Sequence, residues 1–116
     1  NIRLTDAISQ WGNVAGLISG LFMNDMELLG RSMKDVIFEP VRSILIPGFE
    51  EMRIIAMEND AIGFGISGSG PSVFALTKSE NTANKIAEQQ QKLLQKLKIN
   101  SKIYISPVNA TGPKVL

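Results

Sequence analysis

Residues 63–76, GFGISGSGPSVFAL, contain four glycines and a proline within a stretch that otherwise alternates like β-strand. Glycine permits positive φ and lets another backbone or a ligand come close. Consecutive N–H groups in such a loop can form an anion-binding concavity, and the hydroxyls of Ser67, Ser69 and Ser72 could reach a phosphate or a substrate. The Gly-Lys-Ser or Gly-Lys-Thr of a P-loop is absent. Two interpretations stay open from the residues alone, a glycine-rich hairpin turn and a ligand-binding loop.

Arg42, within EPVRSILIPGF (39–49), is the second candidate for chemistry. Arginine presents a planar fork that matches a carboxylate with two parallel hydrogen bonds. The alternative for Arg42 is a surface ion pair with Glu39 or Glu50. Arg3, Arg31 and Arg53 have no comparable support as ligand-binding residues.

The composition narrows the possible chemistry. The 116 residues suffice for one domain, and a net charge of +1 does not indicate a nucleic-acid or membrane-surface partner. With neither cysteine nor histidine, the chain has no thiolate nucleophile and lacks the commonest general base. We identify no catalytic base or metal ligand here, because Asp25, Glu27 and Asp35 are more simply helix caps and solvated charges. The lack of cysteine is compatible with the cytoplasmic location that we expect.

Helical periodicity dominates the first half of the chain. Thr5 or Asp6 is expected to cap a first helix, in which Gly12, Gly16 and Gly20 form one line. This line predicts close packing, either with another helix of the domain or with polypeptide outside this chain. The same helix carries an apolar stripe: Leu4, Ile8, Trp11, Ala15, Ile18 and Phe22.

Two more helices are predicted between residues 23 and 60. Asn24 or Asp25 is the expected cap of the first, and Pro40 is expected to interrupt it. Pro47 suits the first turn of the second, which ends at Asn59–Asp60. The buried face of that helix is expected to comprise Phe49, Met52, Ile55 and Ala56.

The second half begins with a predicted hairpin of strands 61–67 and 72–77. Ser79 is expected to cap a long helix with EQQQK (88–92) on its solvated side. Strand-like patterns recur at 102–108 and, as an edge strand, at 113–116. The order predicts an α+β fold, with helices on one face of a small antiparallel sheet.

GISGSGPSVFAL (65–76) closely resembles the third signature motif of the GHMP kinases, a family that includes galactokinase, homoserine kinase and mevalonate kinase. The segments LTDAISQWGNVAGLI (4–18), EPVRSILIPGF and GPKVL (112–116) are similar to the homoserine kinase version of the C-terminal domain. The resemblance covers essentially the whole chain. Pro113 departs from it, since an alanine is more usual there.

The resemblance implies a ferredoxin-like GHMP kinase C-terminal domain over residues 1–116, without the N-terminal ATP-binding domain that carries the Mg²⁺ ligands and the phosphate loop. It implies ATP-dependent phosphorylation of the L-homoserine hydroxyl in threonine biosynthesis, with this chain inactive alone. Arg42 would bind the substrate carboxylate. The cleft would be lined by Ser67, Gly68, Ser69, Gly70, Pro71 and Ser72. Another GHMP kinase, such as mevalonate kinase, and a free-standing amino-acid-binding module are the alternatives; a homodimer is left open.

Overall fold

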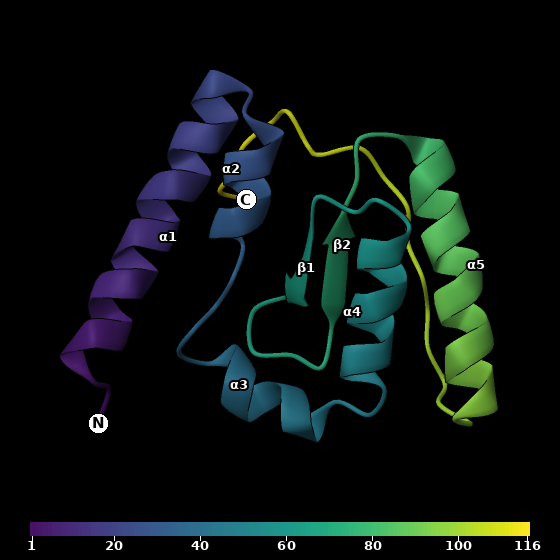
Figure 1. Ribbon diagram of the computed structural model, residues 1–116. Helices are drawn as coiled ribbons and strands as arrows, with labels where there is room; N and C mark the ends of the chain where they lie inside the picture. The colour runs from purple at the N-terminus through teal and green to yellow at the C-terminus, as the bar shows by residue number, and fades with distance from the viewer.

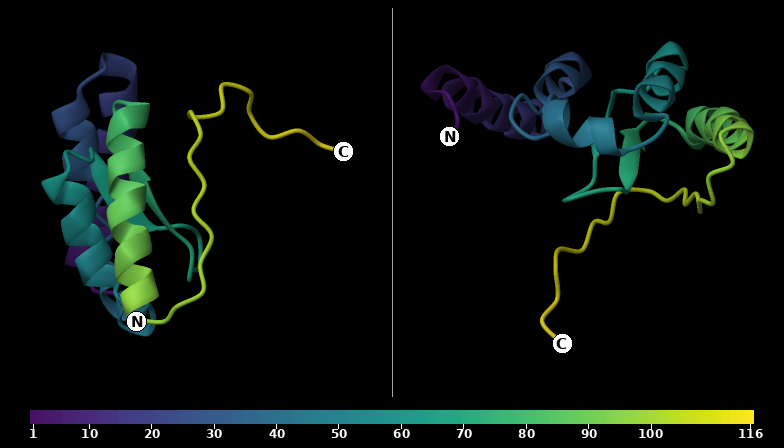
Figure 2. Two further views of the ribbon diagram at one scale, coloured as in Figure 1. Left: turned by 90° about the vertical axis from the view of Figure 1, so that its right-hand side faces the viewer. Right: turned by 90° about the horizontal axis from the view of Figure 1, so that it is seen from below.

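The computed structural model describes all 116 residues, with a layer of helices on one side of a single β-hairpin and no helix or strand in residues 97–116 (Figure 1). Strands β1 (Gly63–Ile66) and β2 (Val73–Leu76) pair antiparallel, with Gly63 opposite Leu76 and Ile66 opposite Val73. The helices are α1 (Leu4–Met23), α2 (Met26–Ser32), α3 (Glu39–Arg42), the 3₁₀ turn η1 (Ser43–Leu45), α4 (Phe49–Glu58) and α5 (Glu80–Lys96). Figure 2 shows the helices along one side of the hairpin, which confirms the α+β prediction. No helix combines the length and apolar character that a membrane span would need.

The core lies between α4, α5 and the hairpin. The spacing of Phe49, Met52 and Ala56 puts these three on one face of α4, and all three are buried as predicted. Ile55 packs at the edge of this core. The Phe49 and Phe64 rings, 5.3 Å apart between centroids, join α4 to β1. The other core residues are Ile46, Ala61, Ile86 and Leu94.

The glycine line of α1 makes a close helix contact, as one of the two interpretations predicted. A Cβ on Gly20 would lie 2.8 Å from the Leu29 backbone nitrogen of α2, and one on Gly16 would lie 3.2 Å from the Ser32 Cβ. Gly12 has no atom within 4 Å of such a Cβ, so it lies outside the contact. The apolar stripe of α1 is not buried by this packing, since Trp11 is 66% and Phe22 90% exposed.

Helix ends follow local hydrogen bonding, which the sequence patterns predicted only in part. Asp25 caps α2 and Ser79 caps α5, as expected, each accepting a backbone N–H. The prediction that Thr5 or Asp6 caps α1 was wrong. Arg3 is the N-cap residue, its side chain makes no cap hydrogen bond, and its guanidinium forms an ion pair with Asp6. Asn59 ends α4 as predicted.

The two prolines near the middle of the chain behave differently from the predictions. Pro40 lies in the first turn of α3, where the missing N–H is not needed, so it begins a helix rather than interrupting one. Pro47 precedes Gly48, which is the N-cap of α4, and therefore lies outside that helix.

The three glutamines of the predicted solvated run are partly buried, and two of them form hydrogen bonds with α4 or its C-cap. Gln90 Nε2 donates to the Met52 carbonyl, and Gln89 exchanges amide hydrogen bonds with Asn59. The prediction for this run was therefore wrong at its three glutamines, and the amides of Gln89 and Gln90 find partners on α4 or at its C-terminal end.

The strands predicted at 102–108 and 113–116 are not present. The backbone from 101 to 116 makes no hydrogen bond with either strand, and Tyr104 is 83% exposed. An alternating pattern specifies which residues would share a face, but a strand forms only where a neighbouring strand accepts its backbone groups. The last backbone link of this end to the domain is Ile99 N to Leu94 O, at 2.9 Å.

Candidate functional site

The glycine motif forms a closed loop at the end of the hairpin. The Ser67 N–H donates to the Ser72 carbonyl at 2.8 Å, and the Gly70 N–H donates to the Ser67 carbonyl at 3.1 Å. Gly68 and Gly70 have φ of 60° and 76°, and a cis peptide bond joins Gly70 to Pro71. The N–H groups of Gly68 and Ser69 have no partner within the chain. Two adjacent exposed donors are therefore available to an anion at the tip of this loop.

Arg42 connects α3 to this loop. Its Nη1 donates to the Ser69 carbonyl at 2.8 Å, although the two residues lie 27 positions apart. Its guanidinium carbon lies 5.8 Å from the centre of the Phe38 ring. Arg42 forms no ion pair: Glu50 pairs with Arg53, and Glu39 has no ion-pair partner. Since arginine carries five N–H donors, the bond to Ser69 leaves most of the fork available.

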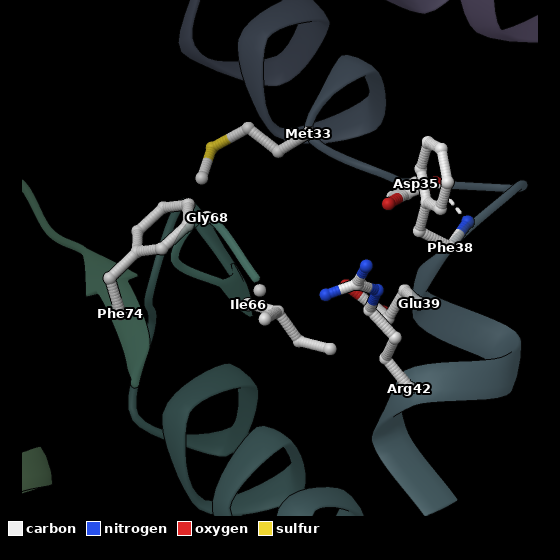
Figure 3. A pocket seen from close by; sticks show the side chains of 9 residues that line it. Met33, Asp35, Phe38, Glu39, Arg42, Ile66, Gly68 and Phe74 are labelled. Carbon is white, nitrogen blue, oxygen red and sulfur yellow. Dashed lines mark hydrogen bonds between the residues drawn. The ribbon is translucent and has the colours of Figure 1, made fainter. Parts of the chain in front are cut away.

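A small cavity lies between α3, the turn before it and the hairpin (Figure 3). Its volume is about 100 Å³, several times the roughly 10–15 Å³ that one water needs. The Arg42 side chain points from α3 into this space, and Phe74 lies across from it on the hairpin (Figure 3). The remaining lining residues are Met33, Asp35, Phe38, Glu39, Gly65, Ile66 and Gly68.

Two carboxylates line the cavity, and their surroundings differ. One oxygen of Asp35 accepts the backbone N–H groups of Ile37 and Phe38, at 2.8 and 2.9 Å. The half-buried Glu39 carboxylate accepts no hydrogen bond and has no ion-pair partner within 4.0 Å.

Partial burial raises the pKa of Glu39 above its usual value, and the nearby negative charge of Asp35 adds to the effect. Glu50 acts weakly in the same direction, while the positive charges of Arg53 and Lys34 oppose it. Glu39 therefore holds a negative charge that the surrounding protein does not fully compensate.

The bare glycine face of β1 is covered by side chains of the same chain. A Cβ on Gly63 would lie 2.5 Å from the Met33 sulfur, and one on Gly65 would lie 3.4 Å from a Glu39 oxygen. The small residues of β1 thus allow Met33 and Glu39 to approach the strand. What comes close to the main chain here is the end of α2 and the start of α3.

Arg42 and the glycine motif, which were selected separately in the sequence, lie together in the structure. Sequence reasoning did not select Glu39 or Asp35 as site residues. Two signals were available: Glu39 and Arg42 are three positions apart, which places them on one side of a helical turn, and an aspartate before a short helix commonly binds the N–H groups that follow it.

A family model for the C-terminal domain of GHMP kinases matches residues 15–96. This match covers well over half of the chain, so the chain belongs to the GHMP kinase family through its C-terminal domain. The family assignment confirms the resemblance carried by the glycine motif and agrees with the α+β architecture.

Proteins named homoserine kinase are among the similar members of the family. The chain is 50% identical over 117 residues to the homoserine kinase of Chlorobium phaeobacteroides strain BS1, and 33% identical over 113 residues to that of Xylella fastidiosa strain M12. These alignments cover 99% and 97% of this chain but only 37% and 35% of the relatives. The crystal structure of homoserine kinase from Cytophaga hutchinsonii superposes with a TM-score of 0.91 at 51% identity, covering 100% of this chain and 37% of that one. The chain thus spans little more than a third of the length of these relatives.

Proposed function

We propose that this chain is the acceptor-side, C-terminal domain of a homoserine kinase, which transfers the γ-phosphoryl group of ATP to the side-chain hydroxyl of L-homoserine on the route to threonine. The relatives' names and the family assignment support this activity. The structural observation that carries the proposal is the Arg42–Ser69 hydrogen bond, which holds a carboxylate-binding side chain against the glycine motif.

In the proposed reaction, this chain positions the acceptor. The free N–H donors of the Arg42 fork bind the homoserine carboxylate, and the bond to Ser69 orients the guanidinium. The unpaired N–H groups of Gly68 and Ser69 provide donors for phosphate oxygens beside the acceptor hydroxyl. Phosphoryl transfer depends mainly on such positioning and on charge stabilisation.

ATP supplies the phosphoryl group, and Mg²⁺ neutralises charge on the phosphates when bound. Within this chain, the two loop N–H donors fit a phosphate oxygen, whereas no cluster of three acidic side chains suits a metal ion. We therefore assign the Mg²⁺ ligands and most of the nucleotide site to the rest of the polypeptide that the relatives possess. We also propose a cytoplasmic location for the enzyme. This chain alone is expected to show no kinase turnover.

An acceptor panel with the full-length protein tests this function. ADP release is measured with ATP and Mg²⁺ against L-homoserine, mevalonate and galactose. The proposal predicts that, of these three acceptors, only homoserine supports efficient turnover. Turnover with mevalonate or galactose, but not homoserine, would assign the chain to another kinase of the same family.

A further inference from the structure

We infer that Glu39 binds the α-ammonium group of the acceptor while Arg42 binds its carboxylate, so that α3 recognises both charged groups of the amino acid. This inference rests on the proposed function and adds a specificity-determining residue to it. It would explain how the domain selects an amino acid over an uncharged alcohol.

The placement of the two side chains supports this assignment. Glu39 and Arg42 are the first and last residues of α3, and both line the same cavity. Side chains three positions apart on a helix are neighbours and readily form an ion pair. No such pair exists here, because no Glu39 oxygen lies within 4.0 Å of an Arg42 nitrogen. The two opposite charges therefore line one cavity without forming an ion pair, which is the arrangement that a ligand carrying both complementary charges requires.

The hydrogen bonding of the carboxylates distinguishes Glu39 from Asp35. Two backbone N–H groups already bind Asp35, and these bonds fix the turn that leads into α3. Glu39 accepts no hydrogen bond, although it is half-buried and lies against β1 at Gly65. The Glu39 oxygens retain contact with solvent, but partial desolvation without a hydrogen-bond partner favours the binding of a cation. An ammonium group would supply that cation and up to three donors.

The test measures which part of the acceptor each side chain recognises. Full-length parent, Glu39→Gln, Arg42→Ala and the exposed control Glu58→Gln are assayed for homoserine kinetics. Each protein is also inhibited with 4-hydroxybutanoate, which lacks the ammonium group, and with 3-aminopropan-1-ol, which lacks the carboxylate. Thermal unfolding of each variant reports any loss of the fold.

Glu39→Gln should raise KM for homoserine by about tenfold or more, because a charge-assisted hydrogen bond is lost. Its inhibition by 4-hydroxybutanoate should stay within about twofold of the parent, since that analogue has no ammonium group to lose. Arg42→Ala should show the opposite pattern, with weaker binding of 4-hydroxybutanoate and unchanged binding of 3-aminopropan-1-ol. Glu58→Gln should match the parent.

An unchanged homoserine KM in Glu39→Gln would overturn the inference, and so would equal weakening of homoserine and 4-hydroxybutanoate. Neither result would affect the proposed function if the parent phosphorylates homoserine. A parent without homoserine activity would instead refute the proposed function itself.

Discussion

Replacing Gly70 with alanine should be the most damaging small change in the glycine motif. Both Gly68 and Gly70 adopt positive φ, which costs an L-residue about 1–2 kcal/mol. The two positions differ in available space. A Cβ on Gly70 would lie 3.3 Å from Ile66 Cγ2 and 3.4 Å from Ile46 Cδ1, whereas a Cβ on Gly68 would have no atom within 4 Å. Gly70→Ala therefore adds crowding against the core to the backbone strain.

The resulting order of destabilisation is Gly70→Ala, then Gly68→Ala at about 1–2 kcal/mol, then Ser69→Ala. Ser69→Ala should stay within about 0.5 kcal/mol, because its hydroxyl makes only a long 3.5 Å contact with the Gly70 carbonyl. Urea unfolding of the full-length variants gives the stabilities, and kcat with homoserine reports the loop geometry. Equal, small losses for all three would show that backbone conformation at this loop does not matter.

Three further predictions concern the rest of the domain. Gly20→Ala should destabilise the protein by more than about 1 kcal/mol in urea unfolding, because the new Cβ would meet the Leu29 backbone. Gly12→Ala, where a Cβ would lie in open space, should stabilise α1 by up to about 1 kcal/mol. Equal effects of the two substitutions would contradict the α1–α2 contact. Ser79→Ala should cost about 1 kcal/mol in the same assay through loss of the α5 cap, and no loss would contradict that cap. Folding raises the pKa of Glu39, so ionisation of this carboxylate destabilises the folded state as the pH rises above the usual pKa of a glutamate. The stability of Glu39→Gln relative to the parent should therefore increase from about pH 4 to pH 7, and a decrease would contradict the assigned environment.

The sequence allowed prediction of features that depend on local pattern. The buried face of α4, the caps Asp25 and Ser79, and the hairpin around the glycine motif all follow from spacing or from side-chain hydrogen bonding over a few residues. The resemblance selected Arg42 and the glycine motif separately, and the hydrogen bond that joins Arg42 to Ser69 was found only in the structure.

Features that depend on partners distant in sequence were not predictable in this way. The strand patterns at 102–108 and 113–116 have no neighbouring strand, and Gln90 is partly buried because Met52 offers a carbonyl across the helix contact. Glu39 was considered only as an ion-pair partner for Arg42, since neither its burial nor the absence of that pair can be deduced from spacing. Its contribution to the cavity emerged only with the packing of α3 against β1.

The most direct test of the account is a comparison of Arg42→Ala with the parent in the full-length protein, varying homoserine and ATP separately. Losing one partner of a desolvated charge pair costs about 2–5 kcal/mol, so KM for homoserine should rise about 30-fold or more, while KM for ATP should change little. The single hydrogen bond to Ser69 predicts a stability loss of only about 1 kcal/mol. An unchanged KM for homoserine, together with a stability loss of several kcal/mol, would make Arg42 a structural tether and contradict the proposed site.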